Sequence, residues 1–225
     1  MKQTVTLGII LALLLACVGA VSAANLVQNG GFEDPLVTVG EFTPNMASGL
    51  TNWNIETGDI DLIGTHWKAY EKSQSIDLRG CSRATISQQI LNTDPKLTYQ
   101  LSFAMSGNPY SGDTSSKIRT VEVYWDNDPA RTYSFDTSLI TSQTSDMKWK
   151  IITIPNLQAT SAATTIKFKD VSPNSNECVG VALDDIIVDT FTPPPVPEFP
   201  TMALPVALII GMLGAVLFIQ RTKDN

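Results

Sequence analysis

The sequence of 225 residues is very poor in histidine, and it lacks the short motifs of common catalytic centres. His66 is the only histidine, which excludes metal sites built from several histidines. The chain has no G-x-S-x-G, no C-x-x-C and no H-E-x-x-H, the motifs of hydrolases, thiol redox centres and zinc proteases. His66 falls in an expected loop, where a passive surface role is favoured over catalysis. The acidic residues show no spacing that selects a glycosidase pair. We therefore expect no catalytic residues and a protein that is not an enzyme.

The central part of the chain also lacks helical periodicity and basic clusters. Residues 24–192 contain 12 Lys and Arg against 20 Asp and Glu, which gives a net charge of −8. Such an acidic domain argues against nucleic acid and anionic lipid surfaces as partners, and it is compatible with divalent cations.

What the central part does contain is period-two alternation of apolar and polar residues. It is clearest in 99–105, 120–125 and 166–169, and shorter strand candidates lie at 60–63, 75–78, 85–91, 132–135 and 149–154. Polar segments with Gly or Pro separate most of these strands. Many short strands divided by turns predict one all-β domain, a sandwich or barrel, over residues 24–191.

Both ends of the chain have the composition of targeting segments. Residues 1–23 have Lys2, an apolar run and the small-residue site Val21-Ser22-Ala23, which is typical of a secretory signal peptide. An uncleaved anchor helix and lipid attachment at Cys17 remain alternatives.

At the other end, residues 192–200 contain five prolines and predict a stiff stalk. The eighteen uncharged residues 202–219 are almost long enough to cross a bilayer as a helix, and we assign 201–225 as a transmembrane tail. Arg221 and Lys223 place the C-terminus in the cytoplasm, so the domain lies outside the cell.

Two cysteines remain after removal of the leader. An even number of cysteines in an exported domain favours a disulfide between Cys81 and Cys178, with two separate buried thiols as the alternative.

The stretches that open and close the domain organise the prediction. Asn25–Gln28 reads as a short strand, Asn29-Gly30-Gly31 as a turn with positive φ, and Phe32 as a core residue with Glu33 at the rim. Val181–Val188 reads as the last strand. We expect the two stretches to meet.

Two resemblances follow from these motifs. Pro197-Glu198-Phe199-Pro200, the apolar helix and the basic end resemble the PEF-CTERM sorting signal of archaeal surface proteins. That resemblance implies an archaeal source and an archaeosortase as partner, which cuts the tail and replaces it with a lipid. A plain single-pass anchor is the alternative. Either way, the protein is held at the outer cell surface by its C-terminus.

The domain resembles the choice-of-anchor C family and the related domain of unknown function 642 proteins. The resemblance is carried by N-L-V-Q-N-G-G-F-E-D-P from Asn25, S-I-D-L-R-G from Ser75 and A-L-D-D-I from Ala182. It implies a single jelly-roll β-sandwich of the galactose-binding type. In such folds a structural Ca²⁺ is held by acids near the first and last strands, which correspond here to Glu33 and to Asp184 or Asp185.

Sugar recognition requires exposed aromatic side chains on which sugar rings stack. The candidate platforms are Trp67, Tyr70, Tyr110 and Trp125 together with Tyr124, whereas Trp53, Tyr99 and Trp149 are expected in the core. The favoured function is a surface-displayed binding or adhesion module for a glycan or a cell-envelope polymer. A passive structural spacer is the alternative, and a surface glycosidase is a distant third.

Overall fold

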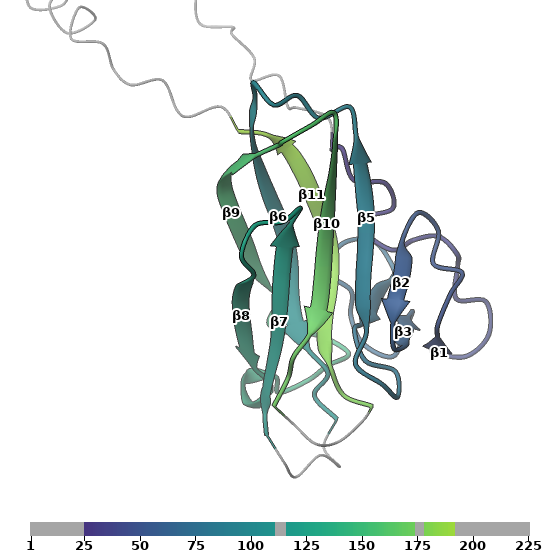
Figure 1. The fold of residues 1–225 in the computed structure, drawn as a ribbon. Coiled ribbons are helices and arrows are strands. Elements are labelled where there is room, and N and C mark those ends of the chain that lie inside the picture. Colours follow the sequence, from purple (N-terminus) through teal and green to yellow (C-terminus); the bar gives the residue numbers. More distant parts are fainter. Residues whose placement is uncertain (1–24, 111–115, 174–177, 192–225) are drawn as a thin grey trace, which may run out of the picture. The chain divides into compact units, whose positions relative to one another are not determined.

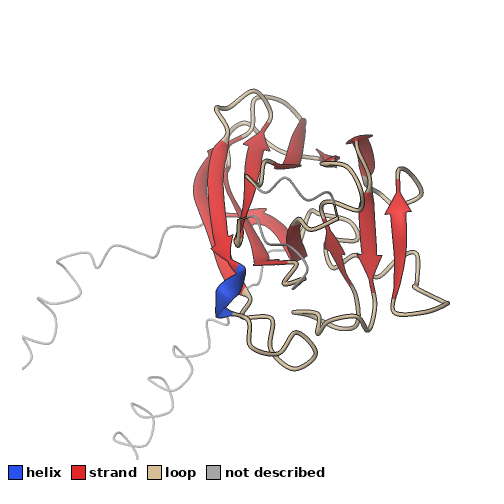
Figure 2. Cartoon of the chain, turned by 90° about the horizontal axis from the view of Figure 1, so that it is seen from below, coloured by secondary structure: helices blue, strands red, loops and turns tan. Residues whose placement is uncertain are grey.

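A computed structural model describes residues 25–110, 116–173 and 178–191, and these residues form a β-sandwich (Figure 1). All pairings between its named strands are antiparallel, so the all-β jelly-roll prediction is confirmed. The single helical element in the described part of the chain is the 3-10 helix η1 (Thr137–Leu139), which is blue in Figure 2. The strands are β1 (Phe42–Met46), β2 (Asn54–Thr57), β3 (Ile60–Ile63), β4 (Ser75–Asp77), β5 (Thr85–Leu91), β6 (Thr98–Gly107), β7 (Ile118–Trp125), β8 (Arg131–Asp136), β9 (Lys150–Gln158), β10 (Ala163–Asp170) and β11 (Val181–Thr190).

The strands divide into two sheets. The six-stranded sheet has the order β1-β3-β4-β11-β6-β9, and the five-stranded sheet has the order β2-β5-β10-β7-β8. Strand β11 lies between β4 and β6, so the last strand of the chain is inserted near the middle of its sheet. The C-terminal end of the domain is therefore held between two neighbouring strands and does not form an edge of the sheet.

The core lies between the two sheets, where the alternating apolar positions meet. In β7, the residues Val121, Val123 and Trp125 are buried and alternate with half-exposed neighbours, as the period-two pattern predicts. Phe103 of β6 packs edge-on against Phe168 of β10, with ring centroids 5.2 Å apart. These contacts join the two sheets across one continuous core.

The opening stretch does meet the last strand, as the sequence predicts. The Leu26 amide donates to the Val188 carbonyl at 2.8 Å, and the Ile186 amide donates to the Gly30 carbonyl at 2.9 Å. Phe32 is fully buried and packs against Trp53, with ring centroids 5.6 Å apart. The predicted strand at 25–28 is wrong in detail, because these residues bond to β11 without forming a regular strand.

The turn prediction also needs a correction. Positive φ angles occur at Asn29 and Phe32, not at the two glycines between them. Gly30 is needed for a different reason: a Cβ atom there would collide with the carbonyl oxygen of Ile186. The turn thus needs a glycine for close approach of two backbones.

Strands β1 and β2 were not predicted, because neither FTPNM nor NIET alternates clearly. Within residues 25–110, 116–173 and 178–191, no helix has the length and hydropathy to cross a membrane. The predicted leader, stalk, transmembrane tail and sorting motif Pro197–Pro200 lie outside the described residues.

Candidate binding sites

Two loops cover the outer face of the six-stranded sheet, and they position the candidate site. One loop follows β3, and the other connects η1 to β9. Trp67 of the first loop and Met147 of the second pack on Ile63 and Ala182 in a second apolar cluster, on the face away from the main core. The loops are thus anchored on the sheet by their own buried side chains.

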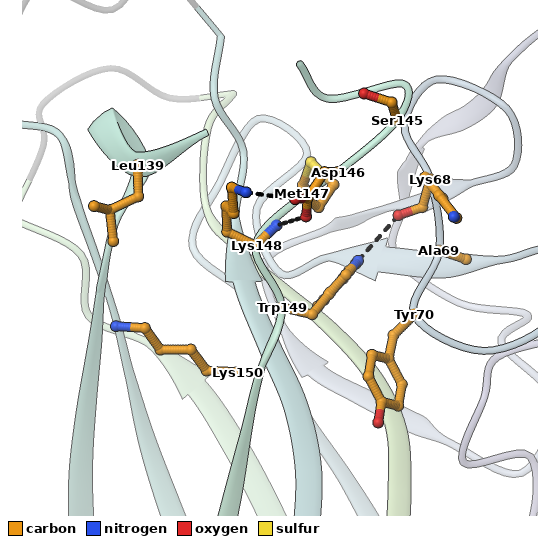
Figure 3. Close-up of a pocket in the computed structure, with 10 residues that line it drawn as sticks. All are labelled: Lys68, Ala69, Tyr70, Leu139, Ser145, Asp146, Met147, Lys148, Trp149 and Lys150. Carbon is orange, nitrogen blue, oxygen red and sulfur yellow. Dashed lines mark hydrogen bonds and ion pairs between the residues drawn. The ribbon is translucent and has the colours of Figure 1, made fainter. Parts of the chain in front are cut away.

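Hydrogen bonds join these two loops directly. The Lys68 amide donates to the Gln143 carbonyl at 3.0 Å, and the Trp149 indole Nε1 donates to the Lys68 carbonyl at 3.0 Å (Figure 3). The Trp67 indole Nε1 donates to Ser75 Oγ at 2.9 Å. Both indoles are therefore held in fixed orientations by the fold.

A cavity of about 630 Å³, here called the Tyr70 cavity, lies between the two loops. Tyr70 is 45% exposed and meets Trp149 in an edge-on contact with ring centroids 6.5 Å apart. Figure 3 shows the two rings side by side at the wall of the cavity. The cavity is lined by Lys68, Ala69, Tyr70, Leu139, Ser145, Asp146, Met147, Lys148, Trp149 and Lys150.

A second cavity of about 300 Å³, here called the Tyr110 cavity, lies over β1 and β3. Tyr110 is 57% exposed at its rim, whereas Trp67 contributes to its wall but is only 2% exposed. His66 also lines it, with Nδ1 2.9 Å from Glu41 Oε2. Burial raises the pKa of the Asp61 carboxyl in this cavity.

Of the sequence-based platforms, Tyr70 and Tyr110 are exposed at two different cavities, whereas Trp67 and Trp125 are wrong as stacking platforms because both rings are buried. Trp125 is 1% exposed, its ring packs near Tyr99, and its Nε1 donates to the Gln158 carbonyl, so no face is open to a ligand. Trp149, assigned to the core, is instead half-exposed beside Tyr70. Its position between Lys148 and Lys150 was the signal in the sequence for a partly exposed ring.

The cysteines lie at the edge of the Tyr110 cavity. The sulfur atoms of Cys81 and Cys178 are 3.1 Å apart, and both residues are exposed thiols in this structure. The alternative of two separate buried thiols is wrong. The disulfide itself stays a prediction.

The predicted metal ligands gather around Gly31. A Cβ atom on Gly31 would lie 3.5 Å from Glu71 Oε2, 3.8 Å from Asp184 Oδ1 and 3.9 Å from Glu33 Cγ, so the missing side chain leaves a space bordered by two carboxyl groups and by the Glu33 methylene. Glu71 was not predicted. Hard oxygen donors of this kind suit Ca²⁺.

A β-bulge in β11 decides which aspartate faces this space. The register against β6 shifts between Asp184 and Ile187, and Asp185 has φ of 48°. The extra residue reverses the alternation, so Asp184 is buried toward Glu71 and Asp185 is half-exposed.

The carboxyl groups already accept hydrogen bonds from the backbone. Asp184 Oδ2 accepts from the amides of Tyr70 and Glu71, and Glu33 Oε1 accepts from the amides of Ser73 and Gln74. Burial raises the pKa of Asp184 to about 7 despite these bonds. Among the described residues, no three His, Cys, Asp or Glu side chains are arranged as a metal site. A cation would therefore have to draw Glu33, Glu71 and Asp184 closer together.

The comparisons with known proteins can now be added. Residues 25–189 match the model of a family described as a protein of unknown function, DUF642, and they make up well over half of the chain. The chain belongs to the DUF642 family. Residues 196–222 of this DUF642 protein match the PEF-CTERM archaeal protein sorting domain. Both resemblances drawn from the sequence are thus confirmed, and the sorting domain indicates a surface protein anchored at its C-terminus.

The individual proteins and solved structures that resemble this chain have low sequence identity to it. The DUF642 protein is 27% identical over 190 residues to halomucin from Haloquadratum walsbyi, a match that covers 80% of this chain and only 2% of halomucin. A structure of TmCBM61 in complex with beta-1,4-galactotriose is 16% identical, with a TM-score of 0.47 over 75% of this chain and 100% of the other. The CBM22-1 xylan-binding domain of Paenibacillus barcinonensis Xyn10C is 12% identical, with a TM-score of 0.41 over 77% and 98%.

Proposed function

We propose that this DUF642 protein is a surface-displayed binding module that takes a glycan chain in the Tyr70 cavity. The observation that carries the proposal is the aromatic pair Tyr70 and Trp149, which lies in an open cavity held by two loops that are bonded to each other. A half-exposed ring at the wall of such a cavity offers an apolar face for stacking, and polar groups around it give hydrogen bonds.

The lining favours binding over hydrolysis. Glycoside hydrolysis normally requires two carboxyl groups that flank the scissile bond. Asp146 is the only carboxylate that lines the Tyr70 cavity, and Asp61 is the only one that lines the Tyr110 cavity, as far as the described residues go. A glycosidase therefore finds no support in either cavity.

The sorting tail completes the proposal. With this tail the module would lie outside the cell, held in one of two ways. Either an archaeosortase cuts the chain after the Pro-rich segment and a lipid replaces the tail, or the uncut apolar helix anchors the protein in the membrane. The domain would then present its cavity to glycans or to polymers of the cell envelope.

The test is a glycan array followed by affinity measurements on the full-length chain in detergent. Replacing Tyr70 with alanine (Tyr70→Ala) should weaken binding of the best glycan about fivefold or more, because truncating an aromatic anchor in a binding site costs more than about 1 kcal/mol. Tyr110→Ala is the matched control from the other cavity, and it should leave the affinity unchanged. A blank array would instead support the passive spacer. An effect of Tyr110→Ala alone would move the site to the Tyr110 cavity.

We also propose that Ca²⁺ binds at Gly31, with Glu33, Glu71 and Asp184 as ligands. The ion would neutralise acids that repel one another and would hold the opening stretch on β11. A ligand that binds only the folded state stabilises it by about 2.7 kcal/mol at a hundredfold excess over Kd. For a domain of this size that corresponds to roughly 5–10 °C in Tm.

The expected result is a fall in Tm of the metal-replete, full-length chain when EDTA is added, measured by tryptophan fluorescence. Glu33→Gln should reduce the response to Ca²⁺, since a neutral amide replaces one carboxylate. Asp128→Asn, at an exposed residue paired only with Arg131 in the described structure, should keep the full response. An unchanged melting curve in EDTA would contradict the calcium proposal.

A further inference from the structure

The Tyr70 cavity has the opposite charge balance from the domain around it. Residues 24–192 carry a net charge of −8. The cavity, however, is lined by Lys68, Lys148 and Lys150 and by one carboxylate, Asp146. These lysines come from two segments about eighty residues apart, so a basic cluster could not be recognised in the sequence. The cavity is a local basic surface on an acidic protein.

Two of the three ammonium groups remain available to a ligand. Lys148 Nζ is paired with Asp146 Oδ2 at 2.5 Å. Among the described residues, no carboxylate lies within ion-pair distance of the Lys68 or Lys150 ammonium. Lys150 Nζ lies 5.3 Å from the centroid of the Phe135 ring. Lys150 interacts electrostatically with Asp136, and Lys68 with Asp146, without forming an ion pair.

The available lysines lie on opposite sides of the aromatic pair. In Figure 3, Lys150 extends toward Leu139 on one side of Trp149, while Lys68 and Tyr70 lie on the other. A ligand that contacts both ammonium groups would therefore have to extend past the Trp149 ring. A chain with negative groups on separate sugars could contact both while one of its rings stacks on Tyr70.

We propose that the glycan taken by the Tyr70 cavity is an acidic one, a polymer whose sugars carry carboxylate or sulfate groups. This inference rests on the proposed function and names its substrate class. The remaining surface of the domain repels polyanions, so an acidic chain is attracted only where the lysines gather. A neutral glycan would gain nothing from the ammonium groups that flank the rings.

The experiment compares glycans that differ only in charge. The full-length chain in detergent is titrated with oligogalacturonate and with its methyl ester, and with a sulfated galactan oligosaccharide and its desulfated form. Each exposed ion pair tightens binding by a factor of about 1.4 to 5, so two lysines predict about two- to twenty-five-fold tighter binding of an acidic form at low salt. The preference should largely disappear at 1 M NaCl, where charges are screened within about 3 Å.

Variants separate the charges from the stacking. The double variant Lys68→Met and Lys150→Met should lose the preference for the acidic form over its neutral partner. Lys96→Met is the matched control, because Lys96 is an exposed lysine at the other end of β6 from the cavity. Lys96 precedes the start of β6, whereas Lys150 pairs with Met105 near the end of that strand. Tyr70→Ala should weaken both forms.

The outcomes distinguish this inference from the proposed function. Equal or tighter binding of the neutral member of both pairs, or array ligands that are all neutral, would overturn the acidic preference and leave glycan binding intact. Equal affinity for single-stranded DNA of matched charge would also overturn it, since recognition would then be of any polyanion. A blank array together with no binding of any of the four probes would reject the proposed function itself.

Discussion

Reduction is expected to lower the free energy of unfolding of the oxidised, full-length chain by about 4–5 kcal/mol. A bond between Cys81 and Cys178 would close a loop across 97 positions, and on the chain-entropy model a loop of about a hundred residues stabilises by nearly that amount. The structure supports the pairing because it brings the two sulfur atoms to 3.1 Å although the residues are 97 positions apart in the sequence. The measurement is urea unfolding followed by tryptophan fluorescence, with and without a reductant.

The control is the double variant Cys81→Ser and Cys178→Ser. It should unfold at the urea concentration of the reduced chain, and a reductant should have no effect on it. Peptide mapping without reduction should recover one linked peptide from the unmodified chain. Recovery of two alkylated thiols from the exported protein would show that the bond does not form.

Phe32→Ala is expected to cost about 3–5 kcal/mol of the free energy of unfolding. Phe32 is fully buried beside Trp53, and a truncated aromatic side chain in a core loses its transfer free energy and leaves a cavity. Because Phe32 anchors the opening stretch, amide exchange at Leu26 and Ile186 should become faster than in the rest of β11. Thermal and urea unfolding give the total loss, and hydrogen exchange gives its location.

Tyr110→Ala serves as the comparison, because that ring is 57% exposed and should cost less than about 0.5 kcal/mol. A loss below 1 kcal/mol for Phe32→Ala would mean that the opening stretch can detach from the sandwich while the two sheets stay intact. The joining of the chain ends would then be a local feature of the fold rather than part of its core.

Alternation of apolar and polar residues was enough to predict the sandwich. The candidates at 60–63 and 85–91 coincide with β3 and β5, and the final strand was placed within two residues of β11. Period two is clearest in β7, where buried and half-exposed residues alternate because one face lies on the core. Strand β3 is buried at all four residues, so its apolar residues rather than alternation revealed it. Period two fails for β1 and β2, whose residues are mostly exposed or half-buried, so neither strand has an apolar face to reveal it.

The bulge at Asp184 and Asp185 shows where a local pattern stops being informative. Continuous alternation left the two aspartates equivalent, each sharing a face with apolar neighbours. One extra residue in β11 shifts the pairing with β6, and that shift puts Asp184 rather than Asp185 beside Glu71. A bulge depends on the partner strand, which the sequence of β11 does not specify.

By itself, the sequence determined the class of fold, the family and the sorting tail, because each depends on patterns of residues close together in the chain. It also led to the expectation that the opening stretch meets the last strand, and the hydrogen bonds between Leu26 and Val188 and between Ile186 and Gly30 confirm that expectation. Tertiary structure decided the candidate binding site, since Lys68 and Tyr70 meet Trp149 and Lys150 only when two distant loops pack on the same sheet. It also decided that Trp125 is a core residue and that Trp149 is not. Exposure of a single aromatic ring depends on what packs over it, and that is set by segments far away in the sequence.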